Sequence, residues 1–270
     1  MKTIDQQKFE HYVSAATNAQ STIFDMLGDY IDVAESWLQH NILGSGLKVD
    51  DLNETLMIEA ERFICLYSFY NAIPELDLIL TDNGFGVVNN DNVSPASADR
   101  VDKLRKQVLK LSNNALDCII DGLRGNALWD DSALAHILIS STFYKADHLS
   151  TYAGMADATR LELANYKTSI FAAENKVVKR ISLNLFKYIL EGIRHDDLKD
   201  VELDLLDSIR CVVGFHLSKD LSSEDVALDD IENFLESNLD AFPLYMSSNE
   251  YKVKHYEHFQ NAKDDSTYFF

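Results

Sequence analysis

The sequence predicts a mainly α-helical fold: a multi-helix bundle with a small β-hairpin insertion and an extended C-terminal arm. Three prolines and ten glycines among 270 residues favour long helices over a loop-rich sandwich or a disordered chain. Apolar residues also recur at helical spacing through most of the chain. A hydrophobic content of 46% allows a core of normal size. We therefore expect a helical body over residues 1–246 and an arm over residues 247–270.

Helix start and stop signals divide the first part of the chain. Thr3, followed three residues later by Gln6, predicts a capping box at the first helix start. Gly44 is placed to end the second helix, and the third should end before Pro74. The three helices are expected at about residues 3–18, 21–44 and 51–73.

The segment at residues 76–88 interrupts the helical pattern and predicts the β-hairpin. "LDLIL" (76–80) is rich in branched residues, a turn able to take positive φ follows, and "FGVV" (85–88) supplies the return strand. An isolated hairpin is marginally stable in water, so we expect it to contact the helices or another chain. Its candidate subunit-interface residues are Asn83, Gly84, Phe85, Val87 and Val88.

Further helices are expected after the hairpin, the first of them capped by Ser94 with Pro95 at its first position. The first half of that helix is basic. These helices are expected at about residues 95–124, 131–145, 157–194, 198–217 and 222–240.

Two parts of the chain look alike. "FDMLGDYIDVAESWLQHNILG" (24–44) is similar to "FAAENKVVKRISLNLFKYILEG" (171–192), and a cysteine on an apolar helix face follows each. This pattern suggests duplicated helical hairpins near residues 24–70 and 171–216. The alternative is that any two amphipathic helices look similar.

The C-terminal arm is rich in aromatic residues without a long periodic pattern. Burying one such side chain is worth about 1.5–3 kcal/mol, so we expect the arm to dock on its own body or on a neighbour. Its candidate interface residues are Tyr251, Val253, Tyr256, Phe259, Tyr268, Phe269 and Phe270.

The chain is strongly acidic, with 44 acidic and 24 basic residues and a formal net charge of −20. A surface this negative repels DNA and anionic membranes at long range. Residues 196–240 hold 14 acidic and three basic residues. They predict either ordinary solvated helix faces or an acidic wall that faces a DNA channel or a basic partner. The candidates for such a channel are Asp225, Asp229, Asp230, Glu232 and Glu236.

No catalytic or cofactor motif is found. The sequence has no Walker loop, no GxGxxG and no HExxH. His255 and His258 flank Glu257, but a metal site needs further ligands that the sequence does not indicate. We therefore expect no catalytic residues, no metal and no cofactor. The three cysteines should be reduced and buried, and neither a signal peptide nor a membrane span is expected.

The block "LTDNGFGVVNNDNVSPASADRVDKL" (80–104) resembles the signature of an uncharacterised family encoded by tailed phages and prophages of Bacteroidota. The segment "FAAENKVVKRISLNLFKYI" and the ending "FQNAKDDSTYFF" resemble it too. The resemblance implies a virion protein of the neck or tail, such as a head–tail connector, adaptor or ring protein. It implies no enzymatic residues.

From this resemblance we expect a dodecameric homo-oligomeric ring that joins the portal to other neck or tail proteins. Genomic DNA would pass through it without specific binding, and the ring would assemble in the bacterial host cytoplasm. Two other hypotheses remain: an acidic DNA mimic that inhibits a host nuclease, and an enzyme whose site is dispersed in sequence.

Overall fold

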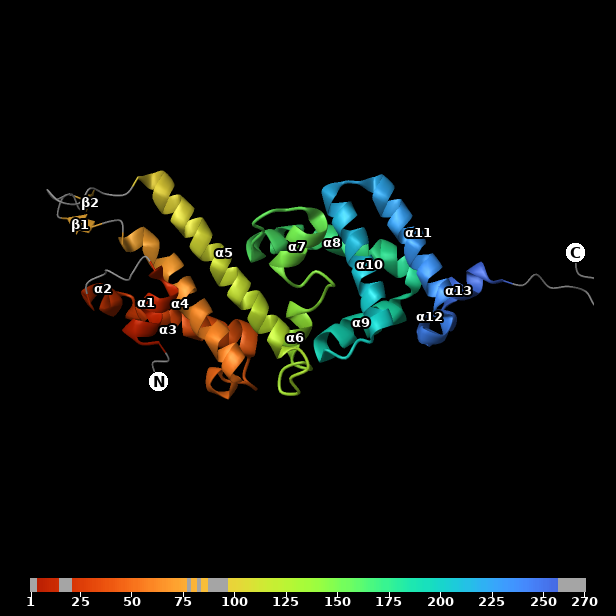
Figure 1. The fold of residues 1–270 in the computed structure, drawn as a ribbon, viewed down its shortest axis with the longest axis horizontal. Helices are drawn as coiled ribbons and strands as arrows, with labels where there is room; N and C mark the ends of the chain where they lie inside the picture. Colours follow the sequence, from red (N-terminus) through yellow and green to blue (C-terminus); the bar gives the residue numbers. More distant parts are fainter. Residues whose placement is uncertain (1–3, 15–20, 77–78, 82–83, 87–96, 257–270) are drawn as a thin grey trace, which may run out of the picture.

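The computed structural model describes residues 4–14, 21–76, 79–81, 84–86 and 97–256. The protein is mainly helical, as the sequence predicts, and these residues form thirteen α-helices. Figure 1 shows an elongated molecule whose N-terminal half and C-terminal half lie at opposite ends of the long axis. One hydrophobic core runs through both halves.

The N-terminal half is organised around two long helices that pack along each other. Glu54–Leu76 forms α4 and Ala98–Leu123 forms α5. Buried residues of both helices, among them Phe63 and Ile119, belong to the main core. The other helices of this half are α1 (Gln6–Tyr12), α2 (Ser21–Met26), α3 (Gly28–Leu38), a π-helix (Gln39–Leu43) and a 3₁₀ turn (Val49–Asp51).

Two predicted helix starts are wrong because other side chains cap the helices. The Asp5 carboxylate accepts from the Lys8 N–H at 2.8 Å and begins α1, which ends at Tyr12 rather than near residue 18. The Asn53 side chain accepts from the Leu56 N–H at 2.9 Å and begins α4. Asp51, where the sequence predicts this helix to begin, belongs instead to the preceding 3₁₀ turn.

The predicted stop before Pro74 is also wrong, because α4 continues through this proline to Leu76. A proline in the last turn removes one backbone hydrogen bond. The neighbouring Ala72 and Ile73 are buried in the core, which favours keeping this turn helical.

The hairpin region holds two strands of three residues each. The strands β1 (Ile79–Thr81) and β2 (Gly84–Gly86) pair antiparallel, with Leu80 opposite Phe85. Leu76, the expected first strand residue, ends α4 instead. Asn83, Val87 and Val88 lie outside the described residues. That this region is a hairpin insertion that contacts another subunit therefore stays a prediction.

The C-terminal half begins with two short helices. The expected helix at 131–145 is only α6 (Ala133–Leu138), and an irregular segment leads from it to α7 (Ala146–Ala153). The long expected helix at 157–194 is broken at Ser182, whose φ of 89° no α-helix accepts. The Ser182 hydroxyl instead caps the helix that follows. The remaining helices are α8 (Arg160–Ile181), α9 (Leu183–His195), α10 (Asp200–Ser218), α11 (Leu221–Ser237), α12 (Pro243–Met246) and α13 (Asn249–Lys254).

Helix α10 passes close to α7 at Gly214. A Cβ atom built on Gly214 would sit 2.1 Å from the carbonyl oxygen of Tyr152, so only glycine fits there. A second, smaller hydrophobic cluster fills the space between α7, α8 and α10.

The helical body extends past the predicted boundary at residue 246. Tyr251 of α13 packs against the main core and meets Tyr245 edge to face, with ring centroids 5.4 Å apart. Lys254 forms an ion pair with Glu232 of α11. The beginning of the predicted arm therefore docks on its own body.

The suspected duplication stays a prediction. Its first segment folds mainly as α3 and the π-helix, whereas its second spans the break at Ser182 between α8 and α9. Within the described residues, no helix is both long enough and apolar enough to cross a membrane.

Candidate functional site

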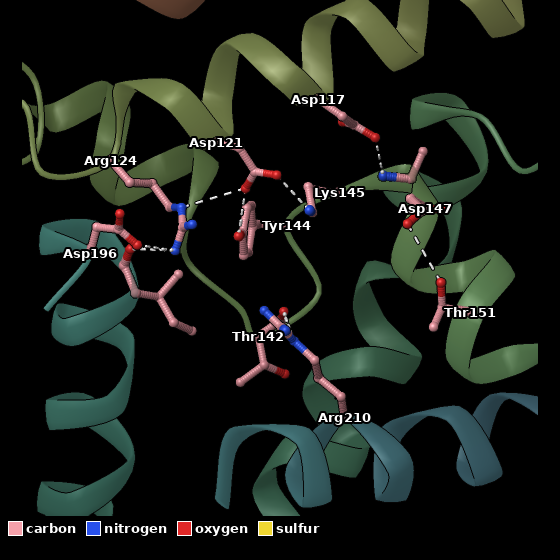
Figure 2. A network of polar contacts seen from close by, with 12 residues as sticks. Asp117, Asp121, Arg124, Thr142, Tyr144, Lys145, Asp147, Thr151, Asp196 and Arg210 are labelled. Carbon is pink, nitrogen blue, oxygen red and sulfur yellow. Dashed lines mark hydrogen bonds and ion pairs between the residues drawn. The ribbon is translucent and has the colours of Figure 1, made fainter. Parts of the chain in front are cut away.

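A network of buried and half-buried polar side chains lies where the two halves of the molecule meet. We call it the polar joint; Figure 2 shows most of it. It combines side chains from the C-terminal end of α5, the segment between α6 and α7, and the helices α8 and α10. Its members are Asp117, Asp121, Arg124, Thr142, Tyr144, Lys145, Arg160 and Arg210.

Asp121 is the centre of the polar joint. Its Oδ1 accepts from the Tyr144 hydroxyl at 2.8 Å, and its Oδ2 accepts from Lys145 Nζ at 2.6 Å. Arg124, which directly follows α5, lies 3.5 Å from Oδ1 and forms a 3.0 Å ion pair with Asp196 beyond the end of α9. These contacts tie α5 to two separate parts of the C-terminal half.

Asp117, one turn before Asp121, makes a second connection. Its carboxylate pairs with Arg160 of α8 at 2.7 Å and accepts from the backbone N–H of Ala146 at 2.9 Å. Burial raises the pKa of Asp117, and the Arg160 charge acts against that rise. Removing Arg160 would therefore leave a buried carboxylate without its partner charge, which is strongly destabilising.

Aromatic rings complete the joint. The guanidinium carbon of Arg210 and the ammonium of Lys145 lie 5.8 Å and 5.7 Å from the Tyr144 ring centroid. His148 of α7 is buried and meets this ring edge to face at 5.0 Å. Burial and the nearby cations, Arg210 foremost, hold the pKa of His148 well below its usual value, so its ring is neutral.

A buried carboxylate on α8 fixes the segment that carries Thr142. Oε1 of Glu174 accepts from the Ser141 hydroxyl at 2.8 Å and from the backbone N–H and hydroxyl of Thr142 at 2.7 Å each. Burial raises the pKa of Glu174, while these three donors act to lower it. The carbonyl of Thr142 then accepts from Arg210 at 3.2 Å.

The polar groups of the joint bind one another and so connect the two halves rigidly. The carboxylates of Asp117, Asp121 and Glu174 are occupied by cations or hydrogen-bond donors, and burial raises the pKa of the Tyr144 hydroxyl. No group of three or more His, Cys, Asp or Glu is arranged to hold a metal in the part of the chain that the structure describes. That the protein is not an enzyme stays a prediction.

An aromatic pocket opens beside the polar joint. It has a volume of about 160 Å³ and lies between the segment 137–144 and the N-terminal half of α8. Phe143, Tyr144 and Phe171 contribute rings to its wall, and Arg160 and Lys167 contribute positive charge. A larger cavity of about 590 Å³ lies next to the π-helix and is lined mostly by polar side chains, including Gln39 and Lys48.

The five predicted acidic candidates on α11 do not form one free acidic surface. Glu232 pairs with both Arg180 and Lys254, and Glu236 lies 3.3 Å from His255. Asp229 is 3.7 Å from Arg180 but is mostly exposed. Asp225 and Asp230 are exposed and have no ion pair within the described residues.

The predicted interface residues of the arm are divided. Tyr251 is partly buried, whereas Val253 and Tyr256 are 77% and 68% exposed. Phe259, Tyr268, Phe269 and Phe270 lie outside the described residues. In the hairpin, Gly84 and Phe85 belong to β2.

The cysteine prediction is only partly right. Cys65 is buried, but Cys118 is exposed on α5 and Cys211 is half-buried. Each cysteine lies among apolar residues of a helix. Apolar neighbours in sequence do not show whether the cysteine itself is on the buried or the exposed face.

The polar joint was missed by the sequence analysis. Its signal is a run of charges at the end of α5, namely Asp117, Asp121 and the C-cap residue Arg124, within a stretch whose other residues are mostly apolar. This spacing puts all three on one helix face. The partners lie 23 to 72 residues away in sequence and could not be chosen without the fold.

One comparison with known proteins gives a match. The model of a family of unknown function, DUF6712, matches residues 21–136 and 217–255, which is more than half of the chain. The matched residues include most of the N-terminal half and the helices α11 to α13. No curated protein and no solved structure matches the chain. The chain therefore belongs to the DUF6712 family, whose description assigns it no function.

Proposed function

We propose that this chain is a non-enzymatic structural subunit of a tailed-phage virion that joins copies of itself into a ring at the head–tail junction. The single observation behind the proposal is that two helical segments of opposite charge lie towards opposite ends of the molecule. Residues 98–110 of α5 carry mainly basic charged side chains, and α11 carries only acidic ones.

The basic end is the first half of α5, which begins at the same end of the long axis as β1 and β2 in Figure 1. Residues 98–110 hold five basic and two acidic side chains in a chain with a net charge of −20. Arg100 and Lys106 are exposed and have no ion pair within the described residues. They are available to a neighbour at this end.

The acidic end is α11, which lies far from the start of α5 in Figure 1. This helix holds six carboxylates and no lysine or arginine. Asp225 and Asp230 are its exposed carboxylates that pair with no cation of the described chain.

Opposite charges at two ends suit head-to-tail contact between identical subunits. Such heterologous contacts close into a ring when the rotation between neighbours divides a full turn. Electrostatic complementarity sets the register of the contact and speeds encounter. A virion ring is favoured over a DNA mimic because Glu232 is neutralised by two cations of the same chain and Glu236 lies 3.3 Å from His255, which interrupts a phosphate-like row of free carboxylates.

The assembly proposal is tested by exchanging charges between the ends. One variant carries Arg100→Glu with Lys106→Glu, and the other carries Asp225→Lys with Asp230→Lys. Each alone should stay monomeric in sedimentation velocity at about 0.05 M salt, where the wild type should associate. An equimolar mixture should associate again, because each reversed end then meets a complementary end.

Lys187→Glu, an exposed change on α9 with no ion pair in the described chain, is the matched control and should leave association unchanged. Association that ignores both charge reversals would contradict the head-to-tail contact. The virion role is checked separately by mass spectrometry of purified phage particles. We expect about twelve copies per particle, as the resemblance implies, and absence of the chain from the particles would end this part of the proposal.

A further inference from the structure

The aromatic pocket has the dimensions of a site for one aromatic side chain. Its volume of about 160 Å³ is close to that of an engineered protein cavity of about 150 Å³ that binds benzene. Ile137, at the pocket edge, is 62% exposed, so an apolar side chain there meets solvent in the single subunit. An entering ring would cover it.

The pocket also selects for negative charge next to the ring. Lys167 Nζ lies 5.5 Å from the ring centroid of Phe171 and has no ion pair within the described residues. Arg160 is held in the wall by its 2.7 Å ion pair with Asp117. Lys167 is therefore the cation at this pocket that is available to a carboxylate of an incoming chain.

We propose that this pocket binds the aromatic segment 264–270 of a second copy of the chain. This segment reads "DDSTYFF" and so combines two adjacent carboxylates with three aromatic side chains. One ring of Tyr268, Phe269 or Phe270 fills the pocket, and a carboxylate of Asp264 or Asp265 pairs with Lys167. The inference rests on the proposed self-assembly and names the segment that links one subunit to the next.

A second copy is favoured as the donor by the geometry of α8. The segment follows α13, which is joined through Glu232 to Arg180 near the end of α8. Successive residues of an α-helix are about 100° apart, so Arg180 projects about 140° away from Lys167 around α8. Helix α13, the last described helix before this segment, is thus joined to the side of α8 that faces away from Lys167.

Photocrosslinking of the full chain tests this site. Phe269 is replaced by p-benzoylphenylalanine, and isotope-labelled and unlabelled chains are mixed, irradiated and digested for mass spectrometry. We expect crosslinks from position 269 to the segments 137–144 and 160–171 that join a labelled to an unlabelled peptide. Crosslinks confined to one isotope would assign the segment to its own subunit, and crosslinks elsewhere would assign it to another surface; either result overturns the proposal.

Two variants check the chemistry of the pocket. Ala164→Trp fills the pocket from an exposed position and should lower the crosslink yield about tenfold or more. Lys167→Glu should lower it as well, whereas Lys179→Glu, an exposed lysine of the same helix away from the pocket, should not. Circular dichroism confirms that each variant is folded. Wild-type yield in both pocket variants would overturn the site while leaving the charge-exchange result intact, so the two proposals fail separately.

Discussion

The hydroxyl of Tyr144 donates a 2.8 Å hydrogen bond to Oδ1 of Asp121, and this bond joins the segment before α7 to α5. Tyr144 is buried and packs against the core of both halves. This hydrogen bond therefore helps to hold the two halves of the molecule together.

Replacing Tyr144 by phenylalanine should lower the free energy of unfolding by about 1–2 kcal/mol, because a charged acceptor loses a buried donor while the ring packing is kept. Urea denaturation followed by circular dichroism measures the change. Tyr166→Phe, an exposed position on α8, is the matched control and should change stability by less than about 0.5 kcal/mol. Equal losses in the two variants would contradict a special role for the Tyr144 hydroxyl.

The unfolding free energy of Glu174→Gln, relative to that of the wild type, should increase as the pH rises from about 4 to 7. The folded pKa of Glu174 is raised by burial, so its protonated form favours the folded state. That contribution is fully present below the unfolded pKa of about 4.3 and is lost as the pH rises through the folded pKa. Glutamine keeps an acceptor for Ser141 and Thr142 but carries no charge.

The measurement is the difference in unfolding free energy between this variant and the wild type across the pH range. Glu191→Gln, an exposed change on α9, should give a difference that stays flat. A flat difference for Glu174→Gln as well would show that its carboxyl titrates alike in both states.

His148→Phe should reduce the loss of stability on acidification. The buried histidine destabilises the fold as the pH falls, whereas the buried Glu174 destabilises it as the pH rises. The folded pKa of His148 is depressed by burial and by Arg210, Lys145 and Arg124. The contribution of the neutral His148 ring to stability is therefore fully present above the unfolded pKa of about 6.5. It is lost as the pH falls from there towards the folded pKa. Thermal unfolding at about pH 7 and pH 5 should show a smaller decrease for the variant than for the wild type. The exposed His136→Phe should leave the wild-type decrease in place.

The three cysteines should react with a thiol reagent in the order of their exposure. Cys118 should be modified first and Cys211 more slowly, while Cys65 should react only when the protein unfolds. Burial raises the pKa of Cys65 to about 12, so little reactive thiolate forms there near neutral pH. Absorbance traces with Ellman's reagent measure the phases, and Cys118→Ser should remove the fastest one. Rapid modification of all three thiols in the folded protein would contradict the described burial.

Helix boundaries were predicted well where a local signal had no competitor. Gly44 follows the π-helix with a φ of 76°, as its place after the last apolar residue indicates. The predicted stop at Pro74 was wrong because tertiary burial of Ala72 and Ile73 outweighs one lost hydrogen bond. At Ser182, an uninterrupted apolar stripe hid a break that the hydroxyl of the same residue stabilises.

The sequence by itself determined that the protein is helical, because hydrophobic periodicity and the scarcity of proline and glycine act locally along the chain. It also determined the acidic charge and where that charge is concentrated. Only the tertiary structure decided which charges remain available: Glu232 is neutralised by Arg180 and Lys254, whereas Asp225 on the same helix is left exposed. The polar joint and the aromatic pocket likewise depend on residues far apart in sequence, which only packing brings within contact distance.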